Sequence, residues 1–359
     1  MVTIKGGGEL LLNYIKTGEN RYRENFGLSF EEFAVGQKFK HRPGVTLSQQ
    51  DNKDEALDTI NNAQLHYDAC YAAQTEWKYC LGVSTMTVQN VVGMTWKTFG
   101  KRQRIVGFDD IAMTHPVFGG DTLYAESEII AVKGYPQDPA LGIVTVVTSG
   151  VNQQGEVVTK ILYHMLMYKA GKHPLDAPVA GAEKLPGDKF ASHRLLADGT
   201  YIENVGMYYE DLQPGDIFEH HPGKTVTAEE NRLHALRSLE WSSQYSDQYY
   251  IDTFLEGAMP VNEAFLIGLV TALTTRSFDR VAANLQWKDI QLPHPLYAGE
   301  TMYAESEILA KRESKSRPTQ GILHVISRAY KQDKTLVCAF ERHLLVYKRG
   351  LGPYEAAGY

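Results

Sequence analysis

The stretch His115-Pro-Val-Phe-Gly-Gly-Asp-Thr-Leu-Tyr-Ala-Glu-Ser-Glu-Ile129 returns almost unchanged as His294-Pro-Leu-Tyr-Ala-Gly-Glu-Thr-Met-Tyr-Ala-Glu-Ser-Glu-Ile308. The offset of 179 residues between them also relates Gly36 to Gly215, the Pro43-Gly44 pair to Pro222-Gly223, Gly142 to Gly321 and Tyr168-Lys169 to Tyr347-Lys348. A period that extends over most of a chain indicates that one structural unit is present twice.

The repeat also places the expected domain boundaries. One copy covers residues 26–170 and the other covers residues 200–350, while residues 171–199 form a linker that begins in a Pro-, Gly- and Ala-rich stretch. Two domains suit a chain of 359 residues, since a domain usually has about 100–200. We expect the two copies to pack together as an intramolecular pseudo-dimer.

Each copy is expected to contain one apolar helix and a run of strands. In the first copy the pattern predicts a strand over 33–45, a polar helix over 48–60 and the apolar helix over 86–97; the second apolar helix covers 263–273. Strands follow over 104–113, 122–133, 143–152 and 157–169, where Val, Ile, Thr and Tyr are enriched. A helix followed by an antiparallel meander predicts the α+β class.

The composition excludes several function classes. A net charge of −7 argues against a chain whose main partner is nucleic acid or an anionic membrane, and no apolar stretch is long enough to cross a bilayer. Cys70, Cys80 and Cys338 lack metal-type spacing, so we expect buried small side chains in a reducing, cytoplasmic setting. No metal motif, phosphate loop or dinucleotide fingerprint predicts a cofactor.

The two copies differ in the segment before the apolar helix. Where the first copy has Asn61 and His66, the second has Glu240 and Tyr245. A histidine with an ordinary pKa of about 6.5 takes or gives a proton near neutral pH. Since packing alone would keep both copies alike, His66 is a candidate acid/base, although a histidine satisfied by ordinary core or surface contacts explains it equally well.

These residues carry a family resemblance that covers about Phe26 to Arg349. The segment Asn61-x-x-x-x-His66-x-Asp68, the turn His-Pro-x-x-x-Gly-Asp/Glu-Thr and the strand Tyr-Ala-Glu-Ser-Glu-Ile resemble the MaoC-like hydratases and dehydratases, and among them the mesaconyl-CoA (2-methylfumaryl-CoA) hydratases or β-methylmalyl-CoA dehydratases. The resemblance implies two tandem hot-dog domains, each an antiparallel sheet wrapped around a central helix.

The resemblance also implies a reaction, the reversible hydration of an α,β-unsaturated acyl-CoA thioester with a short, branched dicarboxylic acyl group. His66 would be the acid/base and Asn61 would orient the water, while Asp68 would either fix the imidazole tautomer or cap a local turn. In the (R)-specific hydratases the pattern is Asp-x-Asn-Pro-Leu-His. Here Asn61 stands at the Asp position, and an amide is no general base.

Oxyanion and CoA contacts are also expected in the first copy. Backbone N–H groups at Ser84 and Thr85, where the apolar helix begins, would stabilise the thioester oxygen, and either side chain serves equally well as an N-cap. The densest cluster of cations would bind the CoA phosphates, or would only decorate a helix C-terminus. Its members are Lys97, Lys101, Arg102 and Arg104.

Two alternatives to hydration stay open. One is an acyl-CoA thioesterase with a carboxylate and an amide on a central helix, for which Asn90, Asn262 and Glu263 are the available residues. The other is an acyl-CoA-binding protein that has lost catalysis with the usual Asp. Either a monomer or a homo-oligomer is compatible with a chain that already holds two units.

Overall fold

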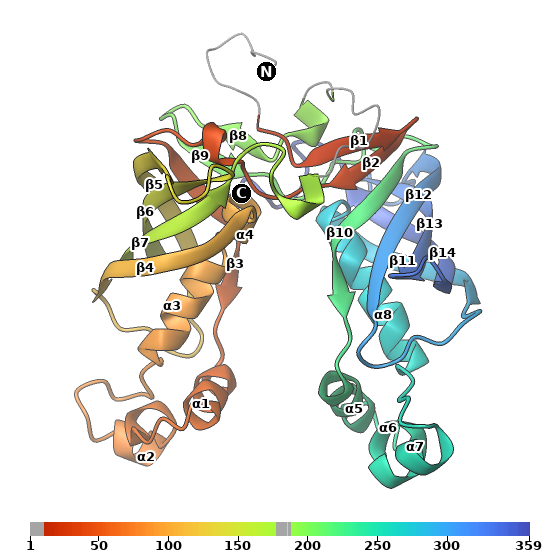
Figure 1. The fold of residues 1–359 in the computed structure, drawn as a ribbon, viewed down its shortest axis with the longest axis horizontal. Coiled ribbons are helices and arrows are strands. Elements are labelled where there is room, and N and C mark those ends of the chain that lie inside the picture. The colour runs from red at the N-terminus through yellow and green to blue at the C-terminus, as the bar shows by residue number, and fades with distance from the viewer. Residues whose placement is uncertain (1–10, 177–184, 186–187) are drawn as a thin grey trace.

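The computed structural model describes residues 11–176, 185 and 188–359. It contains two lobes, each built from one seven-stranded sheet and one central helix (Figure 1). This arrangement confirms the predicted α+β class and the pair of tandem hot-dog units. Part of the expected linker, residues 177–184 and 186–187, lies outside the described residues.

The bounds of the elements follow the repeat closely. The first sheet contains β3 (Lys38–Thr46), β4 (Arg102–Met113), β5 (Thr122–Gly134), β6 (Leu141–Asn152), β7 (Val157–Tyr168), β8 (His193–Leu195) and β9 (Tyr201–Glu203). The second sheet contains β1 (Tyr14–Gly18), β2 (Arg21–Glu24), β10 (Ile217–Thr225), β11 (Val281–Gln291), β12 (Thr301–Glu313), β13 (Gln320–Lys331) and β14 (Leu336–Tyr347). The α-helices are α1 (Gln49–Asp58), α2 (Ala69–Ala72), α3 (Ser84–Gly93), α4 (Trp96–Phe99), α5 (Ala228–Arg237), α6 (Ser243–Ser246), α7 (Gln248–Phe254) and α8 (Glu263–Leu273).

The predicted apolar helix of the first copy is two helices. It begins at Ser84 rather than at residue 86, and α3 ends at Gly93 before the short α4 resumes at Trp96. The Thr95 hydroxyl donates to the Val92 carbonyl at 2.7 Å, so the side chain competes for a carbonyl at the point of interruption. In the second copy the predicted helix 263–273 is observed with the same bounds.

Each sheet is completed by a hairpin that lies next to the other copy in the sequence. The sheet orders are β4-β7-β6-β5-β3-β9-β8 and β1-β2-β10-β12-β13-β14-β11. Hence β8–β9, which precedes the second copy, completes the first sheet through the parallel pair β9–β3, and the N-terminal β1–β2 completes the second through β2–β10. Figure 1 shows both hairpins where the lobes meet. The pseudo-dimer is therefore joined by reciprocal strand exchange.

A buried histidine–glutamate pair fastens each exchanged hairpin. Glu203 of β9 reaches His41 of β3, with Oε1 2.9 Å from Nδ1, and Glu24 of β2 reaches His220 of β10 at 3.1 Å. All four side chains are at most 1% exposed. Burial opposes ionisation of Glu203, but the His41 imidazole outweighs it and lowers the pKa of that carboxyl to about 2.

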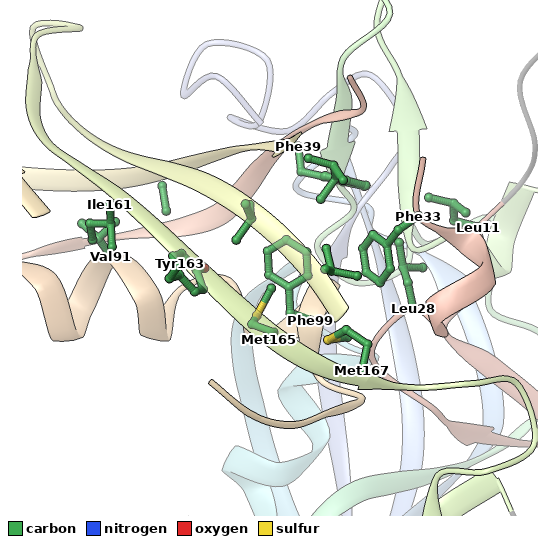
Figure 2. Close-up of a cluster of buried hydrophobic side chains, with 14 residues drawn as sticks. Leu11, Leu28, Phe33, Phe39, Val91, Phe99, Ile161, Tyr163, Met165 and Met167 are labelled. Atoms are coloured by element: carbon green, nitrogen blue, oxygen red, sulfur yellow. The ribbon is translucent and has the colours of Figure 1, made fainter. Parts of the chain in front are cut away.

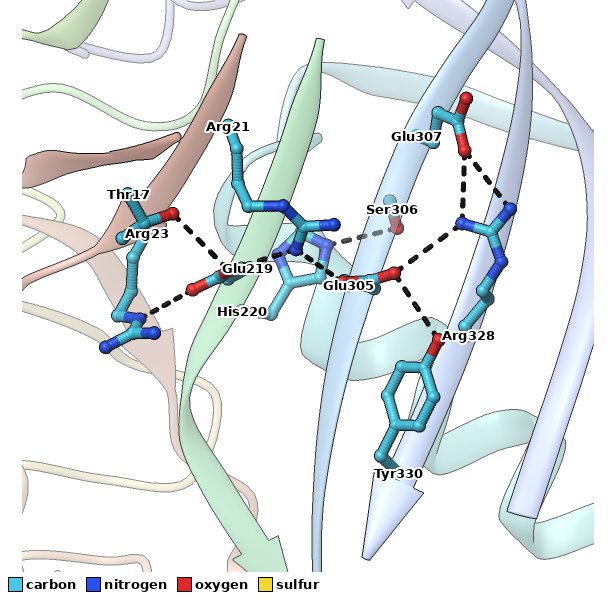
Figure 3. Close-up of polar contacts among 10 residues, drawn as sticks. All are labelled: Thr17, Arg21, Arg23, Glu219, His220, Glu305, Ser306, Glu307, Arg328 and Tyr330. Atoms are coloured by element: carbon cyan, nitrogen blue, oxygen red, sulfur yellow. Dashed lines mark hydrogen bonds and ion pairs between the residues drawn. The ribbon is translucent and has the colours of Figure 1, made fainter. Parts of the chain in front are cut away.

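Ion pairs on the outer face add to the attachment of β2 (Figure 3). Arg21 contacts Glu219 at 3.0 Å and Glu305 at 2.7 Å, and Arg23 contacts Glu219 at 2.6 Å. Arg328 continues the network to Glu305 and Glu307. Glu305 and Glu307 of the repeated strand thus belong to a structural ion-pair network on the second sheet.

The core of the first lobe lies between α3, α4 and the inner face of the sheet (Figure 2). Val91 of α3 and Phe99 of α4 are fully buried with the inward side chains of β7, among them Ile161 and Tyr163. Phe33 and Phe39 close the end near the exchanged hairpin. The alternation of inward and outward side chains explains why the strand patterns were readable from the sequence.

The carboxylates of the repeated turn bond backbone N–H groups within the turn. The Asp121 carboxylate accepts from the Phe118 N–H at 2.8 Å, and the Glu300 carboxylate accepts from the Tyr297 N–H at the same distance. Of the cysteines, Cys80 and Cys338 are buried as expected, whereas Cys70 is exposed, because it lies on the short surface helix α2.

Candidate functional site

His66 lies at the end of the 3-10 turn η2 (Gln64–His66), next to the approach to α3. Its Nδ1 is 2.8 Å from the carbonyl oxygen of Leu81, and this contact requires the proton on Nδ1, which donates. Nε2 is then the nitrogen with a free lone pair. The ring is half-buried, so it is held in place and still reachable. A general acid/base needs a nitrogen that is both fixed and reachable, and the His66 ring meets both conditions.

Asn52 of α1 ties this part of the lobe together. Its Nδ2 donates to the carbonyl oxygens of His66 at 3.0 Å and of Leu81 at 2.9 Å, and its Oδ1 accepts from the Val83 N–H at 2.6 Å. The side chain is 1% exposed. Asn52 therefore fixes the histidine turn relative to the start of α3.

The sequence prediction did not include Asn52, although a signal for it was present. Its counterpart at the 179-residue offset is Asn231, which is buried and bridges the Pro260 carbonyl and the Asn262 N–H in the second lobe. The signal in the sequence is that asparagine occupies this position in both copies. Gln49 supports the same turn, since its Nε2 donates to the His66 carbonyl at 2.8 Å.

Asp68 does not hold the imidazole of His66. It is the N-cap of α2, where its carboxylate accepts from the Tyr71 N–H at 3.0 Å. The role of fixing the tautomer belongs to the Leu81 carbonyl. Asp68 comes two positions after His66, at the start of the short helix α2, and its carboxylate caps that helix.

Asn61 forms a local turn and keeps one donor group available. Its Oδ1 accepts from the Ala63 N–H at 3.0 Å, and Glu240 makes the equivalent bond to the Ser242 N–H in the second lobe. Glu240 is thus a turn residue in the second lobe. Within the described residues Nδ2 of Asn61 makes no hydrogen bond, so this amide is free to orient a water or a hydroxyl.

The N-terminus of α3 is open. Ser84 and Thr85 are both exposed in its first turn, and the N-cap is Val83, which makes no side-chain cap. Neither predicted residue is the N-cap of α3, so the capping alternative does not hold, and the oxyanion role stays a prediction. The first N–H groups of a helix have no acceptor within it, and with the helix dipole they favour a negative charge.

The N-terminus of α8 is closed in the second lobe. The Asn262 side chain caps it by accepting from the Phe265 N–H at 2.9 Å, and the Glu263 carboxylate accepts from the buried Tyr245 hydroxyl at 2.6 Å. Burial, with this carboxylate, raises the pKa of Tyr245 to about 12. The first lobe alone therefore combines a histidine with an open helix terminus.

The four cations predicted to bind CoA have different environments. Lys101 is buried, 2.9 Å from the Asp176 carboxylate, so this ion pair removes it from phosphate binding. Lys97 is half-buried, Arg102 has a buried Nη1, and Arg104 is exposed on β4. The correction for Lys101 arises because its acidic partner is 75 residues away in the sequence.

Comparison with known proteins shows the family of this chain. A family model for mesaconyl-CoA hydratase matches residues 14–169 and 188–358. The chain belongs to the mesaconyl-CoA hydratase family. It is 25% identical over 324 residues to the mesaconyl-CoA hydratase of Cereibacter sphaeroides, covering 84% of this chain and 89% of that protein. It is also 25% identical over 355 residues to the β-methylmalyl-CoA dehydratase of Chloroflexus aurantiacus, covering 93% and 95%.

Two solved structures match most of the chain at low similarity. A putative MaoC domain protein dehydratase from Chloroflexus aurantiacus is 22% identical and covers 90% of this chain and 98% of its own, with a TM-score of 0.40. A Mycobacterium tuberculosis protein with a double hotdog fold is 17% identical, with coverages of 89% and 99% and a TM-score of 0.34.

Family membership makes the chain a hydratase/dehydratase-type lyase. None of the helices in the described part is long and apolar enough to cross a bilayer.

Proposed function

We propose that the protein adds water reversibly to an α,β-unsaturated acyl-CoA thioester such as mesaconyl-CoA, with His66 as the acid/base. The observation that carries the proposal is the bond from His66 Nδ1 to the Leu81 carbonyl, which leaves Nε2 as a proton acceptor. Asn52 links the His66 carbonyl to the Val83 N–H and so connects this turn to the open N-terminus of α3. Support comes from relatives named mesaconyl-CoA hydratase and β-methylmalyl-CoA dehydratase. The three cysteines are free thiols, which agrees with our proposal of a cytoplasmic location.

The reaction uses the residues as follows. His66 Nε2 removes a proton from a water molecule that the Asn61 amide orients, and the water oxygen bonds to Cβ of the thioester. The C=C electron pair moves towards the thioester carbonyl, whose oxygen becomes negative and accepts from the first N–H groups of α3. The imidazolium then returns the proton to Cα. The product is the hydroxyacyl thioester, and the reverse path is dehydration.

The test is the loss of enoyl-thioester absorbance with mesaconyl-CoA, crotonyl-CoA and itaconyl-CoA. We expect His66→Ala to reduce the rate by a factor of about 10²–10⁴, the usual contribution of a positioned acid/base. His115→Ala is a matched control, because its Nδ1 also bonds a backbone carbonyl, that of Val157 at 2.9 Å, but on a surface turn. Release of free CoA without hydration would establish the thioesterase instead, and binding without turnover would refute catalysis.

A further inference from the structure

The C-terminal ends of α1 and α5 expose apolar side chains at matching positions. Leu57 is 52% exposed, and Ile60, just after α1, is 90% exposed. Their counterparts at the 179-residue offset, Leu236 and Leu239, are 44% and 73% exposed. A single exposed leucine is ordinary, but an apolar pair that is exposed at the same place in both lobes indicates a surface for contact. The proposed hydration uses none of these side chains.

Ile60 and Leu239 also hold an unfavourable backbone conformation. Their φ angles are 59° and 64°, in the left-handed region, where glycine follows a helix C-cap far more readily than a branched side chain does. The conformation closes the helix, since in α1 the next N–H, that of Asn61, donates to the Ala56 carbonyl at 2.7 Å. Glycine would close the helix at least as well, so a branched, exposed side chain in both lobes is explained by a contact that it makes.

The charges beside these apolar pairs are opposite on the two helices. Residues 52–60 carry one lysine and three acidic side chains, whereas residues 231–239 carry two arginines and no acid. Asp58 stands where α5 has Arg237; both are exposed, and neither forms an ion pair in the part of the chain that the structure describes. The helix dipole opposes a carboxylate in the last turn, so Asp58 is poorly placed on α1 by itself. A cation from another element, such as Arg237, removes this disadvantage.

The two helix ends lie at the same end of the molecule but on different lobes. Figure 1 shows α1 and α5 at the free ends of the lobes, away from the exchanged hairpins. The hairpins hold the lobes where they meet, and Arg276 of the second lobe lies there 5.9 Å from the centre of the Trp96 ring of the first. A second copy, related by a two-fold axis at the free ends, places its α5 on α1 and its α1 on α5, as closed symmetry requires.

We propose that the protein forms a two-fold dimer in which the α1 tip of each copy contacts the α5 tip of the other. The α1 tip consists of Leu57, Asp58 and Ile60, and the α5 tip consists of Leu236, Arg237 and Leu239. The contact covers the exposed apolar pairs and sets Asp58 beside Arg237 twice in each dimer. Because Ile60 directly precedes Asn61, the contact lies beside the segment that leads to His66.

Sedimentation velocity over a range of protein concentrations measures the dissociation constant of the dimer, independently of the hydration reaction. The wild type is compared with Asp58→Arg, Arg237→Asp and the variant that combines both. We expect each single reversal to raise the dissociation constant at least tenfold, because like charges then meet twice, and the combined variant to stay within about threefold of the wild type. Asp110→Arg is the matched control, since this carboxylate is equally exposed but lies on the edge strand β4; we expect its dimer to be unchanged.

A disulfide tests whether the contact is made with a second copy. Asp58→Cys and Arg237→Cys are combined with Cys70→Ser, which removes the exposed native thiol, and the protein is oxidised. We expect a covalent dimer on a non-reducing gel. A cross-linked monomer would show that the two lobes of one chain close on each other and would overturn the proposal.

Ile60→Gly tests the apolar part of the contact without a charge change. Glycine suits the left-handed conformation, so we expect a melting temperature no lower than that of the wild type and a dissociation constant at least tenfold higher. The proposal fails if the wild type is monomeric at every concentration, if the single reversals and Ile60→Gly leave the dimer unchanged, or if Asp110→Arg weakens it as much as Asp58→Arg does. Circular dichroism checks that each variant is folded.

Discussion

Substitution of His193 by tyrosine should remove much of the protein's acid sensitivity. His193 lies on the exchanged strand β8, is 4% exposed, and has Nε2 3.0 Å from the Thr98 hydroxyl and Nδ1 2.8 Å from the Ser192 hydroxyl. Burial lowers its pKa from 6.5 to about 4, with His41 and Lys97 acting in the same direction and Glu203 opposing them. Tyr14 holds the equivalent position in the second lobe and bonds Ser277, so the tyrosine is the natural replacement.

The magnitude follows from linkage between protonation and folding. The folded pKa is below the unfolded one, so the unfolded chain binds more protons between pH 6.5 and 4 and stability is lost as the pH falls through this window. At about 1.36 kcal/mol per pH unit, the loss attributable to His193 between pH 7 and 4.5 is about 2–3 kcal/mol. The contribution of Glu203, whose folded pKa is about 2, is lost mainly below 4.5 and hardly enters this window.

Urea unfolding followed by far-UV circular dichroism at pH 7, 6, 5 and 4.5 measures this contribution. His193→Tyr is expected to have a stability curve that falls by about 2–3 kcal/mol less than that of the wild type over this interval. His164→Tyr is a control, since this half-exposed histidine lies on the outer face of β7 beside Asp109. Parallel curves for the wild type and His193→Tyr would refute the reasoning.

Three further perturbations test the framework of the site and the exchange. Asn52→Leu removes three hydrogen bonds and leaves the buried Val83 N–H without its acceptor, so it should cost about 1–3 kcal/mol and slow hydration; unchanged unfolding in urea would contradict this. Glu24→Gln breaks the buried pair with His220 and should destabilise the second lobe by about 3 kcal/mol. Amide hydrogen exchange should then become faster in β10 and not in β3. Equally faster exchange in both strands would contradict the idea that each hairpin is held by its own histidine–glutamate pair. Gly142→Ala places a Cβ within 2.2–2.5 Å of the Phe30 ring and should cost about 1–3 kcal/mol in a thermal melt, whereas Gly134→Ala, which meets nothing within 4 Å, should not.

The sequence predicted much of each hot-dog unit because its signals are local. Period-two strands, the polar helix α1 and the apolar helix α8 each bury one face, and that face is written in adjacent residues. The turn carboxylates Asp121 and Glu300 bond N–H groups three residues away, so these contacts are local as well. Comparison of the two copies also singled out His66, because its counterpart is a tyrosine.

Residues whose partners are distant in the chain were less predictable. Lys101 was expected to bind phosphate, but the fold brings Asp176 to within 2.9 Å of it. Asp68 was considered as a partner of His66, but the Leu81 carbonyl, 15 residues away, takes that place. In each case the residue type is visible in the sequence, but the tertiary contact decided which group the side chain bonds.

The duplication, the α+β class and the histidine that distinguishes the two halves were determined by the sequence itself, since repeats and periodic burial leave a direct record in residue order. The reciprocal exchange of hairpins, the buried pairs that fasten them, and the opposition of an open α3 terminus to a closed α8 terminus were decided only by the tertiary structure. The physical reason is that β2 and β9 are too short to carry a periodic signal, and each pairs with a strand far along the chain. Only their burial against that strand, with Glu24 and Glu203 placed on a histidine, determines which lobe they complete.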